Sequence, residues 1–145
     1  MAADKQAWAE WRGDLASGEG TIQRVGSGAF GPLPVTWSAR TGDEGSTTSP
    51  EELIAAAHAS CFSMALSNGL GKQGTPPQRL SVSSTVTFVP GTGITRSALD
   101  VEGDVPGIDE TAFQKAAEDA KEGCPVSMAL RENVELSVTA RLAGS

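Results

Sequence analysis

One stretch of the sequence, residues 49–71, reads SPEELIAAAHASCFSMALSNGLG and predicts a single long helix. Ser49 is a favourable N-cap, and Pro50 fits the first helical position, where its missing N–H leaves no hydrogen bond unmade. Glu52 follows Ser49 by three residues, which is the spacing of a capping box. Because this helix is mostly apolar and carries a cysteine near its middle, we take it as the element around which the chain is organised.

Apolar side chains recur along this helix at steps of three and four residues, which predicts one apolar stripe. The stripe is expected to comprise Leu53, Ala57, Cys61, Met64 and Ala65. Two glycines, Gly69 and Gly71, are expected to end the helix. The helix is more apolar than a 145-residue monomer easily covers, so we expect a homodimer in which it is buried.

The length and charge of the chain limit the classes of protein to consider. It has 145 residues, a formal net charge of −7 and a sequence pI of about 4.6, which argues against binding to nucleic acid. Residues 1–11 lack the apolar region of a secretory signal, and we expect no membrane-spanning segment. Two cysteines without an export signal indicate a reducing compartment. We therefore expect one cytoplasmic domain covering residues 1–145.

The rest of the sequence predicts an α+β fold with largely antiparallel sheets. Alternating apolar residues predict strands over 7–13, 21–25, 35–40, 80–89, 94–105 and 134–142. A second helix is expected over 111–122 behind an Asp109 N-cap, and a short helical segment is expected to begin at Pro125. Apart from that short segment, the predicted order is β-β-β-α-β-β-α-β, with the long helix at its centre.

The two cysteines, Cys61 and Cys124, are the side chains with the clearest potential for chemistry. A thiol reacts as the thiolate, which a helix N-terminus or a nearby cation favours. Cys124 lies at a predicted helix start, whereas Cys61 needs a cation, for which Arg40 is the candidate. Glu51 could hold Arg40, although ten residues of helix separate Glu51 from Cys61 by about 15 Å. The alternative is that Glu51 only complements the helix dipole.

His58, the one histidine of the chain, offers a weaker alternative. It lies one helical turn before Cys61, so the two side chains could form a thiol–imidazole dyad. No third residue that would orient the imidazole is evident from the sequence. Two cysteines and one histidine at this spacing form no recognisable metal site, so we expect neither a metal nor another cofactor.

These residues support two functional hypotheses equally. One is a dithiol enzyme in which Cys61 attacks the substrate and Cys124 resolves the product. An apolar dithiol site suits the reduction of a peroxide, which passes through a sulfenic acid and then a disulfide. The other is a non-enzymatic dimeric small-molecule-binding domain whose cysteines are incidental.

Four stretches of the sequence resemble the OsmC/Ohr family, and within it the osmotically inducible OsmC branch. They are WRGDL from residue 11 with SGEGTI after it, SPEELIAAAHASCFSMAL from residue 49, VPGID from residue 105 and GCPVS from residue 123. These motifs follow the family order and span residues 11–127, so the resemblance covers most of the chain. CPVS indicates the OsmC branch, because the Ohr branch typically has an aromatic residue after the proline.

The resemblance implies an activity, a fold and a set of site residues. The activity is that of a thiol-dependent peroxidase, which reduces organic hydroperoxides, and hydrogen peroxide less well, in bacterial cytoplasm. The fold is an intertwined homodimer with active sites at the subunit interface. By motif, Cys61 matches the peroxidatic cysteine, Cys124 matches the resolving cysteine that forms a disulfide with it, and Glu51 matches the carboxylate that pairs with the catalytic arginine.

The catalytic arginine implied by the resemblance matches Arg40, with Arg24 and Arg12 as the other candidates. The resemblance also implies an external dithiol reductant, such as a lipoylated protein, and no metal or haem. It also implies a role in defence against oxidative and osmotic stress. The net charge and the hydropathy, for their part, predict no nucleic-acid or membrane partner.

Overall fold

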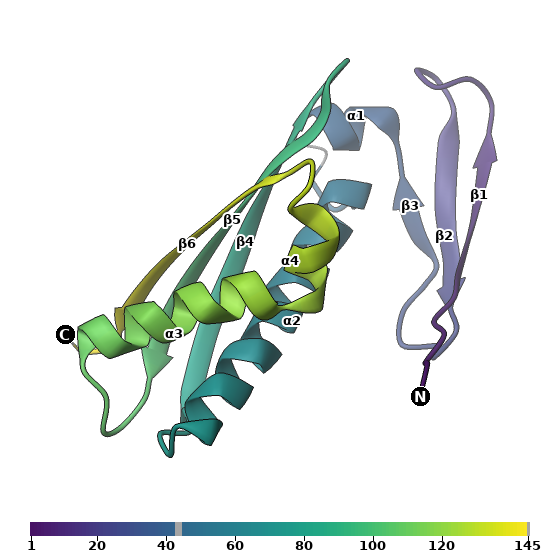
Figure 1. Cartoon of the computed structure of the whole chain (residues 1–145). Helices are drawn as coiled ribbons and strands as arrows, with labels where there is room; N and C mark the ends of the chain where they lie inside the picture. Colours follow the sequence, from purple (N-terminus) through teal and green to yellow (C-terminus); the bar gives the residue numbers. More distant parts are fainter. Residues whose placement is uncertain (43–44, 145) are drawn as a thin grey trace. The chain divides into compact units, whose positions relative to one another are not determined.

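The computed structural model describes residues 1–42 and 45–144, and Figure 1 shows the order of its helices and strands. The chain divides into two compact units, Met1–Leu53 and Ile54–Ser145. The first contains the N-terminal strands, and the second contains most of the long helix and the C-terminal sheet. The expected single domain over residues 1–145 remains a prediction.

The N-terminal unit is built on a three-stranded antiparallel sheet with the order β1-β2-β3. Its strands are β1 (Ala7–Arg12), β2 (Glu19–Val25) and β3 (Leu33–Val35). The first two strands agree with the predicted ones. Because β1 and β2 run antiparallel, the glycine-containing segment between them is a turn, as its composition indicates.

The strand predicted over residues 35–40 is wrong, because the chain leaves β3 at Val35 and begins helix α1 (Trp37–Thr41). Thr36 is the N-cap of α1, and its side-chain oxygen accepts a hydrogen bond from the backbone N–H of Ala39 at 3.1 Å. That capping bond satisfies a backbone donor that a helix start otherwise leaves unpaired. Arg40 therefore lies in the last turn of a short helix and not at the end of a strand.

The long helix, α2 (Pro50–Lys72), begins where the sequence predicts. The hydroxyl of Ser49 accepts a hydrogen bond from the backbone N–H of Glu52 at 3.2 Å, which is half of the expected capping box. The carboxylate of Glu52 accepts a hydrogen bond from the Thr48 hydroxyl at 2.9 Å. The start of α2 is therefore fixed by side chains on both sides of the helix boundary.

The end of α2 differs from the prediction, because the helix continues through both glycines that were expected to stop it. Gly74 has the left-handed φ of +83° that glycine adopts readily. Its N–H donates a hydrogen bond to the carbonyl of Gly71 at 3.1 Å, and the N–H of Thr75 donates one to the carbonyl of Leu70 at 3.0 Å. These two bonds form a Schellman motif, which places the true stop at Gly74.

The C-terminal unit packs α2 and α3 (Glu110–Gly123) on one face of a three-stranded sheet, as Figure 1 shows. The strands are β4 (Arg79–Val89), β5 (Gly93–Asp104) and β6 (Glu135–Leu142), in the order β4-β5-β6. Asp109 caps α3 as predicted, and its carboxylate accepts a hydrogen bond from the N–H of Ala112 at 2.8 Å. The predicted α+β class with a long central helix is confirmed, and the order of elements differs from the predicted one by the added helix α1.

One strand pair in this sheet is parallel. β4 and β5 form the predicted antiparallel hairpin, whereas β5 and β6 run parallel. Between β5 and β6 the chain passes through α3 and the short helix α4 (Pro125–Leu130), and such a helical crossover returns the next strand in the same direction.

The buried stripe of α2 is rotated from the predicted one. Its fully buried side chains repeat at steps of four residues and comprise His58, Phe62, Leu66 and Leu70. Met64, which belongs to the predicted stripe, is 71% exposed, and Cys61 is partly buried beside the true stripe. The large side chains gain the most from burial and set the rotation of the helix, which a pattern dominated by alanine does not reveal.

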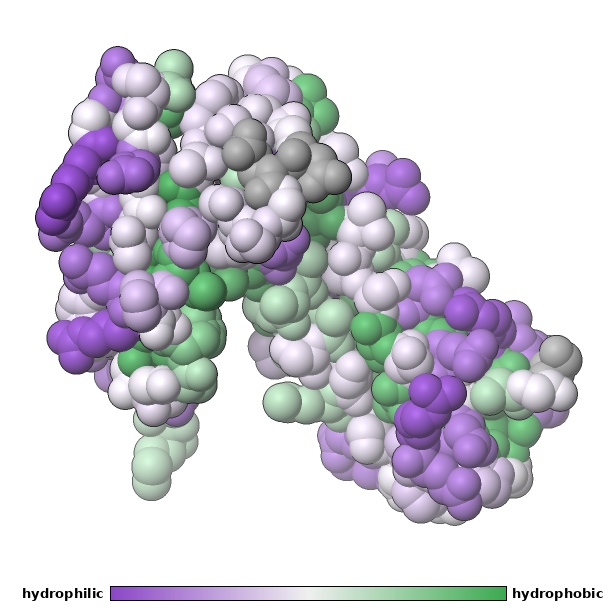
Figure 2. All heavy atoms as spheres, turned by 180° about the vertical axis from the view of Figure 1, so that it is seen from behind, coloured by the Kyte–Doolittle hydropathy of each residue, from purple (hydrophilic) through white to green (hydrophobic). Residues whose placement is uncertain are grey.

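Helix α2 is long and apolar enough to cross a membrane, judged by length and composition alone. Core helices of soluble proteins pass the same test, and the buried stripe makes α2 a core helix of this fold. Other apolar side chains reach the surface, where Figure 2 shows them in green among polar residues. The large exposed ones are Met1, Trp11, Leu15, Phe30, Met64, Val89 and Met128.

Substitution of Gly74 by alanine is expected to lower the free energy of unfolding by about 1 kcal/mol, because alanine is strained at this positive φ. The matched control is Gly71→Ala, which adds the same methyl group within α2 and is expected to leave stability unchanged or raise it by about 0.5–1 kcal/mol. Apart from the adjoining residues and the backbone of the same helix, no atom of the described residues lies within 4 Å of a Cβ at either position, so crowding does not separate them. Urea denaturation measures the free energy of unfolding of both variants. Equal changes in Gly74→Ala and Gly71→Ala would reject the Schellman motif as the end of α2.

Candidate functional site

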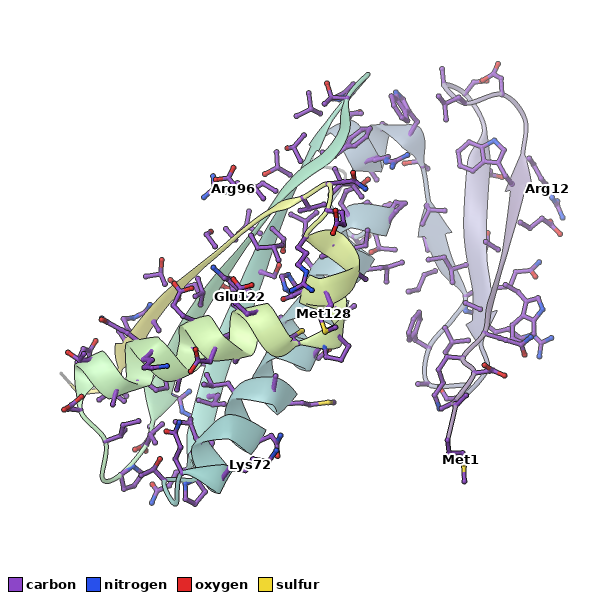
Figure 3. All side chains as sticks on the ribbon, in the orientation of Figure 1. Met1, Arg12, Lys72, Arg96, Glu122 and Met128 are labelled. Atoms are coloured by element: carbon purple, nitrogen blue, oxygen red, sulfur yellow. The ribbon has the colours of Figure 1, made fainter. Side chains whose placement is uncertain are left out.

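The two cysteines lie against each other in the C-terminal unit. Cys61 is in the middle of α2, and Cys124 is the N-cap of α4 with a fully buried side chain. Their thiols are within hydrogen-bonding contact and are not joined by a disulfide. Figure 3 shows sulfur atoms gathered where α4 meets α2, beside the labelled Met128. The fold therefore brings together the two thiols that the sequence analysis singled out.

The neighbours of Cys61 within this unit raise the pKa of its thiol. Burial is the main cause, because it disfavours the charged thiolate. The backbone N–H of Val126 donates a hydrogen bond to the Cys61 sulfur and lowers the pKa, whereas the hydrogen bond and charge of Cys124 raise it further. A reactive Cys61 thiolate at neutral pH therefore needs a cation in addition to these neighbours.

His58 forms hydrogen bonds away from the thiols and does not build the thiol–imidazole dyad. Its ring is fully buried, with Nδ1 2.6 Å from the hydroxyl of Ser97 on β5 and Nε2 2.8 Å from the hydroxyl of Ser127 on α4. The Ser97 hydroxyl lies in turn 2.9 Å from that of Ser84 on β4. Because both ring nitrogens are engaged by serines, His58 is not placed to deprotonate Cys61.

Sequence reasoning missed this hydrogen-bonded chain. A signal for it was present, because Ser84 and Ser97 occupy inward positions of β4 and β5 among apolar neighbours. A small polar side chain on a core-facing position needs a partner, and His58 is the one that α2 provides. Burial also lowers the pKa of His58, so its ring is neutral at pH 7.

Arg40 and Glu51 form the ion pair that the sequence predicts, within the N-terminal unit. Nε of Arg40 donates to Oε1 of Glu51 at 2.7 Å, and the Glu51 side chain is 8% exposed. The second carboxylate oxygen, Oε2, is buried and has no hydrogen-bond partner among residues 1–42 and 45–144. The structure thus contains the Arg40–Glu51 ion pair, whereas the action of Arg40 on Cys61 remains a prediction.

The other two candidate arginines have different partners. Arg12 forms an ion pair with Glu10 at 2.7 Å on the exposed strand β1. The guanidinium of Arg24 lies 3.9 Å from the centroid of the Trp8 ring, in a cation–π contact. Of the three, Arg40 is the one paired with a buried carboxylate, which is the arrangement that holds a guanidinium in a fixed orientation.

The described part of the chain contains no group of three histidine, cysteine, aspartate or glutamate side chains that could hold a metal ion. His58, the one residue of the chain that would offer a ring nitrogen as a ligand, is held by two serines. The expectation that the protein uses no metal or other cofactor remains a prediction.

A helix-borne thiol in contact with a second thiol, on an α+β fold with this order of elements, defines a two-cysteine thiol protein. A sequence profile of the family described as OsmC-like protein matches residues 42–139, and the chain belongs to this family. Peroxiredoxin OsmC of Escherichia coli strain K12 is 41% identical over 140 residues, which cover 94% of this chain and 96% of that protein.

More distant relatives agree with this assignment. The organic hydroperoxide resistance protein of Xanthomonas axonopodis pv. citri strain 306 is 30% identical over 99 residues, which cover 68% of this chain and 70% of that protein. The crystal structure of an organic hydroperoxide resistance protein OsmC from Legionella pneumophila matches with a TM-score of 0.72 and 26% identity, covering 96% of this chain and 98% of that one. The predicted family and OsmC/Ohr fold are confirmed, and the predicted peroxidase class agrees with the name of the Escherichia coli relative.

The depressed pKa of His58 predicts that stability falls as the pH drops below about 6.5, the ordinary pKa of histidine. In that range the unfolded chain binds a proton at His58 that the folded chain does not, so acid favours unfolding, by at most about 1.4 kcal/mol per pH unit. His58→Gln cannot titrate and should lose less stability between pH 7 and pH 5. Urea denaturation at both pH values tests this. Equal losses of unfolding free energy in the wild type and in His58→Gln would mean that folded His58 is protonated.

Proposed function

We propose that this protein is a thiol-dependent peroxidase that reduces organic hydroperoxides, and hydrogen peroxide less well. The observation that carries the proposal is the contact between the Cys61 and Cys124 thiols, which come from two different helices. The proposal is supported by 41% identity to a protein named peroxiredoxin, and by relatives named for organic hydroperoxide resistance.

The proposed reaction takes place in two steps on the protein, followed by an external reduction. The Cys61 thiolate attacks one oxygen of the hydroperoxide, the O–O bond breaks, and the leaving alkoxide takes a proton to give the alcohol. Cys61 is then a sulfenic acid. The Cys124 thiol attacks that sulfur, which releases water and forms the Cys61–Cys124 disulfide. An external dithiol, such as a lipoylated protein, returns two electrons and two protons.

The contact geometry supports the assignment of the two roles. Cys61 is partly exposed and can meet a substrate, whereas Cys124 is fully buried beside it and is protected from direct attack by peroxide. A resolving thiol benefits from this position, because it reacts only with the neighbouring sulfenic acid.

Arg40 is proposed to supply the charge that Cys61 lacks in its own unit. A guanidinium is always protonated, so it favours a nearby thiolate and can orient a peroxide oxygen, but it cannot act as a base. Glu51 is proposed to hold Arg40 in position through the 2.7 Å ion pair. The arginine can come from the same chain or from the second chain of a dimer.

The active form is proposed to be an intertwined cytoplasmic homodimer, with residues 1–145 acting as one OsmC-like domain. The match to peroxiredoxin OsmC of Escherichia coli covers 94% of this chain, and hence residues of both compact units, which supports a single functional domain. Met64 on α2 and Met128 on α4 are large apolar side chains exposed in the single chain, and a second chain would cover such residues. Two unpaired cysteines suit a reducing compartment, and the proposed role is defence against oxidative and osmotic stress.

Substitution of either cysteine by serine separates the two proposed roles. Cys61→Ser is expected to abolish consumption of cumene hydroperoxide in the presence of dithiothreitol. Without dithiothreitol, which would itself reduce a sulfenic acid, Cys124→Ser should consume about one equivalent per chain and then stall with Cys61 as a sulfenic or more oxidised acid. Intact-mass spectrometry after one equivalent of peroxide should show the wild-type chain lighter by two hydrogen atoms.

Two free thiols after exposure to cumene hydroperoxide would instead support the non-enzymatic dimeric small-molecule-binding domain. The raised pKa of Cys61 within its own unit is the observation that favours this second candidate. Hydrogen peroxide, assayed in parallel, is expected to react more slowly than the organic peroxide.

Removal of the Arg40 charge is expected to weaken the Cys61 thiolate. In the wild-type protein the pH midpoint for alkylation of Cys61 by iodoacetamide should lie below about 8.5, the ordinary thiol pKa. In Arg40→Met it should rise above that value, because burial and Cys124 then set the pKa. Arg24→Met is the matched control, since it removes the same charge from the Trp8 ring and should keep the wild-type midpoint. Equal midpoints in wild type and Arg40→Met would remove Arg40 from the mechanism.

A further inference from the structure

A chain of three serine hydroxyls and one imidazole, buried except at the partly buried Ser84, links the sheet to α4 through α2. It runs from Ser84 on β4 to Ser97 on β5 at 2.9 Å, to Nδ1 of His58 at 2.6 Å, and from Nε2 of His58 to Ser127 at 2.8 Å. His58, Ser97 and Ser127 have no exposed surface. The proposed reaction uses none of these four side chains.

This chain ends next to the thiols. Ser127 directly follows Val126, whose backbone N–H donates to the Cys61 sulfur, and Cys124 begins the same short helix. On α2, His58 lies one helical turn before Cys61. The start of α4 is therefore attached to α2 at two adjacent points, Ser127 on His58 and Val126 on Cys61.

The short helix α4 depends on such contacts for its position. It has six residues, too few for a helix to be stable in water without tertiary contacts. Its N-cap, Cys124, makes no side-chain capping hydrogen bond. The bond from Ser127 to His58 is a buried polar contact, and such contacts specify one arrangement where apolar packing alone would allow several.

We propose that His58 is a positioning residue, which holds α4 through Ser127 so that the Val126 N–H and the Cys124 thiol stay against Cys61. The relevance of this role to peroxide reduction rests on the proposed function. The positioning itself concerns only the environment of the Cys61 sulfur, and it can be measured without any peroxide.

Two effects follow from this role. If α4 is released, the Cys61 thiolate loses the hydrogen bond from Val126, and the thiol becomes less acidic. The titratable group that acts on Cys61 in the described part of this unit is the Cys124 thiol at the start of α4, whereas the His58 ring on α2 is engaged by Ser97 and Ser127. Release of α4 also moves Cys124 away from Cys61, which slows closure of the disulfide.

The deciding experiment compares serine substitutions at the two ends of the chain. Ser127→Ala breaks the bond to α4, whereas Ser84→Ala removes an equivalent hydroxyl on the sheet side. Alkylation of Cys61 by iodoacetamide is followed from pH 6 to pH 10 in the reduced full-length protein, with the modified peptide identified by mass. Ser127→Ala is expected to raise the midpoint and to slow alkylation at pH 7 by about three- to tenfold. Ser84→Ala should stay within about twofold of wild type.

A second pair of variants tests His58 itself. In His58→Gln, the side-chain amide reaches the place of Nε2 and can keep the bond to Ser127. In His58→Asn, the shorter amide reaches the place of Nδ1 and can keep only the bond to Ser97. The proposal expects a near-normal alkylation midpoint for His58→Gln and a raised midpoint for His58→Asn.

Equal midpoints within each pair, in proteins shown to be folded by circular dichroism, would overturn the proposal and leave His58 a packing residue. If one variant fails to fold, the other pair still decides. Lack of peroxide consumption by the wild-type protein would reject the proposed function and leave this alkylation test valid.

Discussion

The burial of one stripe of α2 on the C-terminal sheet is the constraint on which the site depends. Phe62, Leu66 and Leu70 are fully buried, and each such side chain contributes about 1.5–3 kcal/mol when it leaves water. Their spacing of four residues fixes the rotation of the helix about its own axis. That rotation puts His58 into the core and leaves Cys61 at its edge, where the thiol is both packed and accessible. The partial exposure of the Cys61 thiol therefore follows from where three large apolar side chains point.

The same burial works against thiol reactivity. A partly buried sulfur is harder to ionise, and the adjacent Cys124 opposes a negative charge on Cys61. The hydrogen bond from Val126 offsets part of this penalty without adding a charge. A thiol in this setting is stable as the neutral group until a cation is brought to it, so ionisation can be restricted to the assembled active site. Arg40, the cation proposed for this role, is held by the buried carboxylate of Glu51 at 2.7 Å.

The sequence predicted those features that depend on neighbouring residues. Ser49 and Asp109 start their helices as expected, because N-capping needs only a side-chain oxygen and a nearby N–H. Residues 35–40 were misassigned, because six alternating residues fit a strand or a capped helical turn equally well. Gly74 was overlooked as the stop of α2, since the choice among three glycines depends on which one adopts a positive φ. The His58 chain joins four separate elements, so it forms only once the sheet and both helices are assembled.

The two thiols are close in space and distant along the chain, since the segment between them runs from Cys61 through both long strands and α3 to Cys124. A covalent bond between such positions closes a loop of about 60 residues. Closing a loop of this length reduces the entropy of the unfolded chain enough to stabilise the fold by about 4 kcal/mol. In the proposed cycle, the oxidised protein is thus more stable to unfolding than the reduced protein. Reaction with peroxide would raise the free energy of unfolding of the C-terminal unit, and reduction of the disulfide would lower it again.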